Sequence, residues 1–228
     1  FLQHQNISMN KLGAVGLLAV GVSALSDPPN VDGNTQVNDK DLIAYYNSRN
    51  GASWIAGYND FFAGMSFNDA RATLGAQPSH ISEHLNETLP DSVYEAVDAV
   101  PAQFDARTKW HGLIHPIRDQ QHCGSCWAFS AAEVLGDRVA IARGKPSPPL
   151  SPQDMVSCDR GDNGCRGGML SNAWRYLKRN GIVTESCFPY TAGRRDVPRC
   201  ANRCVDSEPF KKTKAAPIYP VKGVRNMQ

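Results

Sequence analysis

The chain has 228 residues, of which 41% are hydrophobic and 20% charged, a composition ordinary for one or two globular domains. Its formal net charge of +2 gives no reason to expect a nucleic acid or an anionic membrane as partner. The seven cysteines say more, because an odd number in an oxidising compartment predicts three disulfides and one free thiol.

The first 25 residues indicate the compartment. Residues 1–8 precede the first methionine, and we interpret them as untranslated or leader sequence outside the fold. Residues 9–11 form a short basic start, and an apolar run over residues 12–25 ends in small residues. This run is shorter than the roughly 17 to 25 residues that span a bilayer. Residues 9–25 therefore predict a signal peptide, and we expect a secreted or a lysosome- or vacuole-like location without a membrane span.

Two short helices are predicted in the segment that follows. The first covers residues 38–50, with Asn and Asp side chains at its start and Gly51 as its stop. The second covers residues 66–74. Three residues mark its ends, Ser66 and Asp69 spaced as a capping box and Gly75 as the C-cap.

Residues 77–100 lose helical periodicity and carry two prolines, so we interpret them as a linker. Within the linker, Asn86-Glu-Thr is a glycosylation sequon. We predict that Asn86 is glycosylated if the chain is secreted, and an unmodified sequon is the alternative.

The character of the sequence changes at residue 101, because all seven cysteines lie beyond it. Three amphipathic helices are predicted here, over residues 125–143, from residue 151 onward, and over residues 171–178. Their end signals are Gly144 after the first, Ser151 with Pro152 before the second, and Asn180-Gly181 after the third.

The segment that decides the chemistry runs from residue 120 to 127 and reads Gln-Gln-His-Cys-Gly-Ser-Cys-Trp. It places Cys126 where a loop turns into a helix. The thiol there faces unsatisfied backbone N–H groups and the positive end of the helix dipole, which both favour thiolate. Such a thiolate can attack a carbonyl, and nearby N–H groups can bind the resulting oxyanion. The side-chain amide of Gln120 can supply a second donor.

The run Cys-Gly-Ser-Cys-Trp, followed by Ala-Phe-Ser, resembles the nucleophile motif of the papain-like cysteine peptidases. The resemblance implies that Cys126 is the nucleophile and that Gln120 helps to form the oxyanion hole. It extends from about residue 38 to 204 and is most similar to the cathepsin B-like branch, whose prosegment is short. The implied fold class is α+β. We expect a papain-like two-domain fold, represented mainly by the helical left domain and the prosegment, with most of the β-rich right domain missing.

The resemblance also implies a set of substrate-binding residues. Cys165-Arg-Gly-Gly matches the family's next landmark, where paired glycines let the substrate backbone approach closely. An ordinary turn is the alternative for these glycines. The implied set is Gly124, Trp127, Gly167, Gly168, Met169 and Leu170, of which the last two would wall an apolar pocket.

Spacing alone leaves 15 ways of pairing six cysteines. The family resemblance implies one of them, Cys123–Cys165, Cys158–Cys200 and Cys187–Cys204. In this pattern Cys126 is the unpaired thiol.

Three other interpretations compete with the peptidase. A thioredoxin-like redox pair, Cys123 with Cys126, requires a βαβ context that the pattern does not show. A zinc site requires paired C-x₂-C knuckles, which the other five cysteines lack, so we expect no metal and no cofactor. A catalytically inactive secreted binding or adhesion protein on the same fold remains the alternative, although Cys126 is present.

Two departures from the family pattern shape the prediction. Cathepsin B proper has an occluding loop with paired histidines, but residues 188–199 hold no histidine and leave no room for that loop, which predicts an endopeptidase. The family's catalytic His and Asn follow the nucleophile by roughly 130 to 150 residues, whereas all six histidines here precede Cys126. We therefore expect a C-terminally truncated chain that is itself inactive.

The predicted organisation is an inhibitory propeptide and linker over residues 26–97 and a peptidase domain over residues 98–228. We expect protein or peptide substrates and the chain's own propeptide as partners. The propeptide is expected to lie across the cleft, docked by aromatic side chains that include Trp54 and Phe61, and to be weakened by acid. The carboxylates expected to respond include Asp41, Asp60 and Asp69.

Overall fold

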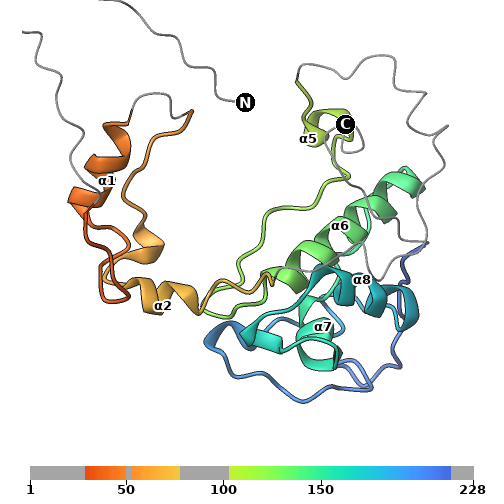
Figure 1. Cartoon of the computed structure of the whole chain (residues 1–228). Helices are drawn as coiled ribbons and strands as arrows, with labels where there is room; N and C mark the ends of the chain where they lie inside the picture. The colour runs from red at the N-terminus through yellow and green to blue at the C-terminus, as the bar shows by residue number, and fades with distance from the viewer. Residues whose placement is uncertain (1–28, 50–52, 78–102, 217–228) are drawn as a thin grey trace, which may run out of the picture.

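The computed structural model describes residues 29–49, 53–77 and 103–216 (Figure 1). The predicted leader, the signal peptide, residues 78–100 of the predicted linker and Asn86 lie outside these ranges. The described chain is mainly helical, and its β pairing consists of isolated bridges. No helix in the described ranges is long and apolar enough to cross a membrane.

The N-terminal segment contains α1 (Lys40–Asn47), the 3₁₀ helix η1 (Asp60–Phe62) and α2 (Phe67–Arg71). Asp39 caps α1, and its side chain accepts hydrogen bonds from the amides of Asp41 and Leu42. Two asparagines then fasten the chain after α1. The side chain of Asn38 donates to the backbone carbonyl of Asn59 and accepts from its amide. The side chain of Asn47 makes the same pair of bonds with the backbone of Ala56.

The second helix confirms its predicted start and corrects its predicted end. Ser66 and Asp69 form the capping box, with both reciprocal bonds present. However, α2 ends at Arg71 with Ala72 as its C-cap, so Gly75 is not the stop. The backbone continues instead in tighter turns, in which the amides of Thr73 and Leu74 donate to carbonyls three residues earlier. This tightening carries Gly75 on toward the cysteine-rich part of the chain.

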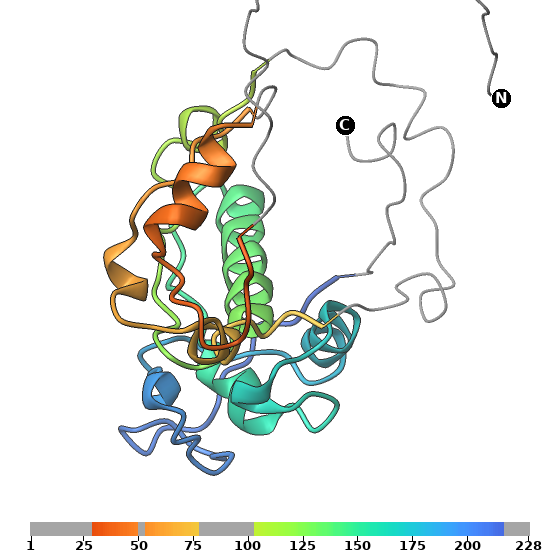
Figure 2. The same ribbon diagram turned by 60° about the vertical axis from the view of Figure 1, so that its left-hand side comes forward.

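The cysteine-rich part is built on three packed helices, α6 (Cys126–Arg143), α7 (Pro152–Cys158) and α8 (Leu170–Arg179) (Figures 1 and 2). Short elements complete it: α5 (Ala106–Lys109), η2 (Gly164–Arg166) and η3 (Ala192–Arg194). Gly144 ends α6 in the left-handed conformation, and Ser151 caps α7 with Pro152 in the first turn, as predicted.

The core lies where these helices meet. The alanines of α6 at positions 128, 131, 132 and 140 are fully or almost fully buried and allow α7 and α8 to approach closely. Large side chains fill the remaining space, namely Trp127, Met155, Leu177 and Ile182, each with no exposed surface. A smaller cluster of Val183, Cys187 and Phe188 lies beside it. Burial of this apolar surface fixes the start of α6, and Cys126 with it, relative to the rest of the domain.

Candidate active site

Cys126 is the first residue of α6 and the only free cysteine among the described residues. The preceding Ser125 makes no side-chain cap, because its hydroxyl lies 2.8 Å from the hydroxyl of Tyr190. No hydrogen-bond partner for the amide of Cys126 is found in the described part of the chain. The amide of Cys126 therefore stays available beside the half-buried thiol, at a helix start that favours anions.

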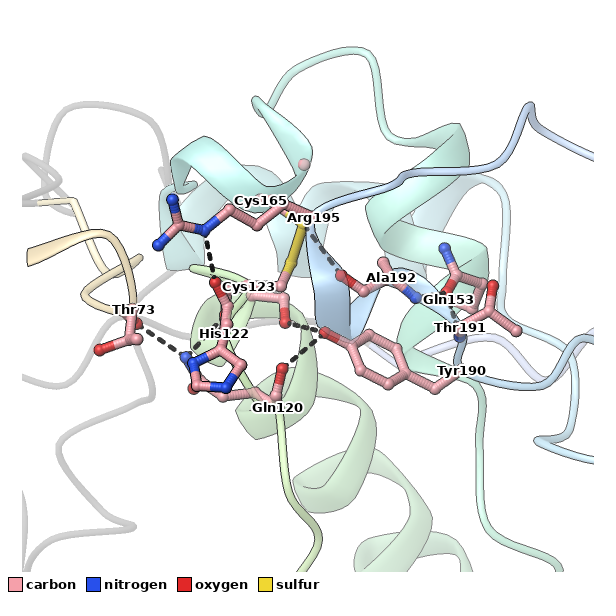
Figure 3. Close-up of a disulfide and its surroundings, with 12 residues drawn as sticks. Thr73, Gln120, His122, Cys123, Gln153, Cys165, Tyr190, Thr191, Ala192 and Arg195 are labelled. Carbon is pink, nitrogen blue, oxygen red and sulfur yellow. Dashed lines mark hydrogen bonds between the residues drawn. A yellow bond between two sulfur atoms is a disulfide. The ribbon is translucent and has the colours of Figure 1, made fainter. Parts of the chain in front are cut away.

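Gln120 is held beside the nucleophile loop by three hydrogen bonds (Figure 3). Its side-chain amide donates to the carbonyl of Cys123 at 2.8 Å and to that of Thr73 at 2.7 Å. The backbone carbonyl of Gln120 accepts a hydrogen bond from the hydroxyl of Tyr190 at 2.9 Å. Tyr190 thus contacts both Gln120 and Ser125. The motif gave no signal of this, because Tyr190 lies far away in the sequence.

The disulfide Cys123–Cys165 joins the nucleophile loop to the segment that contains Gly167 and Gly168 (Figure 3). The amide of Gly124 donates to the carbonyl of Cys165 at 3.0 Å, and a Cβ at Gly124 would lie 2.6 Å from that oxygen. Only glycine fits this close approach. The other two disulfides join Cys158 to Cys200 and Cys187 to Cys204, the same pairs that the resemblance implies.

Of the two adjacent glycines, Gly168 forms a peptide-pairing edge, whereas the backbone of Gly167 bonds within its own loop. Gly168 makes a parallel bridge with Ala76: its amide donates to the carbonyl of Gly75 at 2.8 Å, and its carbonyl accepts from the amide of Gln77 at 2.9 Å. A Cβ at Gly168 would lie 2.6 Å from the ring of Trp127. The fully buried Trp127 therefore lies directly beneath this edge, and its indole N–H donates to the carbonyl of Gly164 at 3.1 Å.

The two remaining predicted substrate-binding residues lie at the start of α8. Met169 is the N-cap residue and is half-buried, and Leu170, the first helical residue, is exposed. Both follow the pairing edge directly, and the structure places them beside Gly168 rather than in the central core.

The N-terminal segment crosses the site. A hollow at Cys126 is lined by residues of the segment and of the nucleophile loop, namely Phe61, Phe62, Thr73, Leu74, Gly75, Ala76, Asp119, Gln120 and Gln121. The ring of Phe61 stacks on His122 with centroids 5.6 Å apart. Trp54, expected to dock as well, is exposed and packs against Tyr46 of α1. The segment therefore approaches the site through Phe61 and residues 73–77.

A base for Cys126 does not come from the histidines at positions 111, 115 and 122. None of these three hydrogen-bonds the thiol in the described structure. His115 is engaged elsewhere, with one ring nitrogen 2.7 Å from Asp137 and the other 2.8 Å from the carbonyl of Ser147.

Comparison with known proteins gives consistent relatives. A family model described as papain family cysteine protease matches residues 100–226. The tubulointerstitial nephritis antigen-like protein of Homo sapiens is 39% identical over 73% of this chain and 36% of its own length. Cathepsin B-like CP2 of Giardia intestinalis is 36% identical over 67% of this chain and 51% of its own length. The chain spans about a third to a half of these relatives.

Among solved structures, proCathepsin B S9 from Trypanosoma congolense is similar with a TM-score of 0.74 and 29% identity. The match covers 85% of this chain and 68% of that one. It therefore includes the N-terminal segment as well as the cysteine-rich part.

Proposed function

Because the chain belongs to the papain family of cysteine proteases and to its cathepsin B-like branch, we propose that it is the precursor of a cysteine endopeptidase with Cys126 as nucleophile. The observation that carries the proposal is the free thiol at the uncapped start of α6, while the other six cysteines are paired. A structural cysteine in an oxidising compartment would be expected in a bridge.

The proposed reaction begins when the Cys126 thiolate attacks a peptide carbonyl and forms a C–S bond. The carbonyl electron pair moves onto oxygen, and the amide of Cys126 and the side-chain amide of Gln120 bind this oxyanion. As the tetrahedral intermediate collapses, the C–N bond breaks and the leaving amine takes a proton from an imidazolium. Water then hydrolyses the acyl-enzyme. The family resemblance implies a downstream histidine for the proton transfers, so turnover is proposed for the whole protein.

Endopeptidase action is proposed because residues 188–199, where an occluding loop would lie, are too few to close the end of the cleft. Residues 188–199 contain no histidine, and they form η3 and short loops tied down by Cys187–Cys204 and Cys158–Cys200. Internal cleavage of a protein substrate by the full-length gene product, with fragments mapped by mass spectrometry, tests this. Release of C-terminal dipeptides alone would refute it.

We further propose that the N-terminal segment is an inhibitory propeptide. Thr73 occupies the Gln120 amide that would bind the oxyanion, and residues 75–77 occupy the pairing edge of Gly168. A peptide substrate cannot use these groups at the same time. We expect the propeptide to be removed after the protein is secreted or delivered to a lysosome-like compartment. Detection of a cleaved signal peptide and of an N-glycan at Asn86 would support this route.

The decisive experiment compares full-length wild-type protein with Cys126→Ser on fluorogenic peptides after propeptide removal. We expect activity in the wild type only. The alternative, a secreted binding protein without catalysis, is favoured by one observation: relatives at 39% identity bear the name of an antigen. It would be supported if processed wild-type protein with an intact Cys126 thiol cleaves no peptide.

A further inference from the structure

A segment far along the chain, residues 190–195, holds the backbone of the nucleophile loop (Figure 3). The amide of His122 donates to the carbonyl of Gly193 at 2.9 Å, and the carbonyl of His122 accepts from Nε of Arg195 at 2.9 Å. Both backbone groups of His122 are therefore bound by this segment. The contacts of the Tyr190 hydroxyl with the same loop add to them, because Tyr190 is the first residue of the segment.

The backbone on both sides of these hydrogen bonds is strained. Gln121 of the loop and Arg195 of the segment have positive φ angles of 55° and 69°. Residues other than glycine enter this left-handed region at a cost in free energy, and they stay there where surrounding contacts enforce it. The path of the nucleophile loop therefore depends on where residues 190–195 are held.

Gln153 fixes that segment to the core. It lies in α7 and has no exposed surface, and its side-chain oxygen accepts from the amides of Thr191 at 2.8 Å and Ala192 at 3.0 Å (Figure 3). Its side-chain nitrogen donates to the hydroxyl of Ser157 at 2.9 Å. Because α7 packs against α6, the accepting oxygen is held in a rigid position. Ala192 is also fully buried, so its amide cannot turn to water if this acceptor is lost.

We propose that Gln153 is a positioning residue of the active site. From the core it fixes residues 190–195, and these hold the nucleophile loop in the geometry that directs Cys126 and the side-chain amide of Gln120 at the same substrate carbonyl. Gln153 acts through the backbone of this segment and not by touching the reacting atoms. Its effect on catalysis rests on the proposed function, whereas its hold on the nucleophile loop does not.

The first test uses the chain itself and needs no catalysis. Amide hydrogen exchange at His122 is compared with exchange at Leu177, a fully buried residue of α8 that a general loss of stability would affect equally. Gln153→Met keeps nearly the same length but has no oxygen. Protection at His122 should therefore fall by about tenfold relative to Leu177, the order expected for two lost buried hydrogen bonds. In Gln153→Glu a carboxylate oxygen accepts from both amides, so protection should return to the wild-type value.

Ser157→Ala is the matched control. It removes the third hydrogen bond of the Gln153 side chain and leaves the two that face residues 190–195. This variant should keep the His122 protection of the wild type. Unchanged protection at His122 in Gln153→Met, or an equal loss in Ser157→Ala, overturns the proposal. If Gln153→Met does not fold, Gln153→Asn takes its place under the same criteria, because its side-chain amide is one methylene shorter.

The second test measures positioning in the full-length protein after propeptide removal, with kcat expressed per reactive Cys126 thiol. Gln153→Met should lower kcat by about tenfold or more, since a misplacement of about 1 Å can cost roughly a hundredfold. KM should stay near the wild-type value, because the pairing edge of Gly168 is untouched, and Gln153→Glu should restore kcat. If the wild type shows no turnover, the proposed function fails, and the exchange results alone decide whether Gln153 holds the loop. If turnover is seen and kcat per thiol is unchanged in Gln153→Met, the positioning role fails alone.

Discussion

At the scale of single residues, the site depends on how closely two backbones approach. Gly75 of the N-terminal segment lies against Gly124 of the nucleophile loop, and a Cβ at Gly75 would be 1.8 Å from the carbonyl oxygen of Gly124. The backbone of Gly124 cannot move aside as a flexible side chain would. The two glycines together let the segment reach both Gln120 and Gly168.

Gly75→Ala should therefore lift the segment from the cleft. We expect Cys126 in this variant to react with iodoacetamide faster than in the wild type, because the thiol is less covered. Gly57→Ala is the matched control, since a Cβ at Gly57 meets nothing within 4 Å. Equal labelling rates in Gly75→Ala and Gly57→Ala would contradict the prediction.

Tyr190 offers a second prediction at this scale, because its hydroxyl contacts both Ser125 and Gln120. Burial raises the pKa of Tyr190, so the hydroxyl remains a donor at physiological pH. Tyr190→Phe removes two hydrogen bonds and should lower the free energy of unfolding by about 1 to 2 kcal/mol. Urea denaturation measures this. Tyr58→Phe, an exposed tyrosine with no hydrogen bond in the described structure, should change it little.

At the scale of elements, the capping box of α2 has a definite pH response. Hydrogen bonds from the hydroxyl and then the amide of Ser66, with a smaller contribution from Arg195, lower the pKa of Asp69. Because its pKa is lowered in the folded state, the charged Asp69 stabilises α2 at pH values above the ordinary pKa of 3.8. This stabilisation is lost as the pH falls through the folded-state pKa. Asp69 is therefore expected to respond to acid only below pH 3.8.

We expect the Ser66 amide in the wild-type chain to keep its NMR shift from pH 7 to 5 and to move only below about pH 4. In Asp69→Asn this low-pH change should disappear, and in Asp60→Asn it should remain. A midpoint near pH 5 for the wild-type Ser66 amide would contradict a lowered pKa of Asp69.

The same elements show how far sequence reasoning reaches. Helix starts at Ser66 and Ser151 and the stop at Gly144 were predictable, because each depends on a local hydrogen bond or a local backbone angle. The role of Gly75 was not predictable. A glycine is needed there because the backbone of Gly124, a residue far along the chain, lies against it. The nucleophile motif located Cys126, but Tyr190 becomes visible only when tertiary packing brings it to the site.

At the scale of the whole molecule, the disulfides divide into one that organises the site and others that only stabilise. Cys123–Cys165 spans 42 residues and ties the nucleophile loop to the pairing edge, whereas Cys187–Cys204 spans 17 and lies in the smaller cluster. In the chain-entropy model these loops contribute about 4 and about 3 kcal/mol, so their losses destabilise by similar amounts. Stability alone therefore cannot distinguish them.

Reactivity should distinguish them. Replacing both Cys123 and Cys165 by Ala removes the link between the loop of Cys126 and the edge that pairs with residues 75–77. The Cys126 thiol should then react faster with iodoacetamide, measured at a temperature where the variant is folded. Replacing Cys187 and Cys204 should lower the melting temperature comparably and leave the labelling rate of Cys126 near that of the wild type. If both pairs raise the labelling rate equally, general loosening explains the effect. If only the first does, the bridge couples the nucleophile to the segment that covers it.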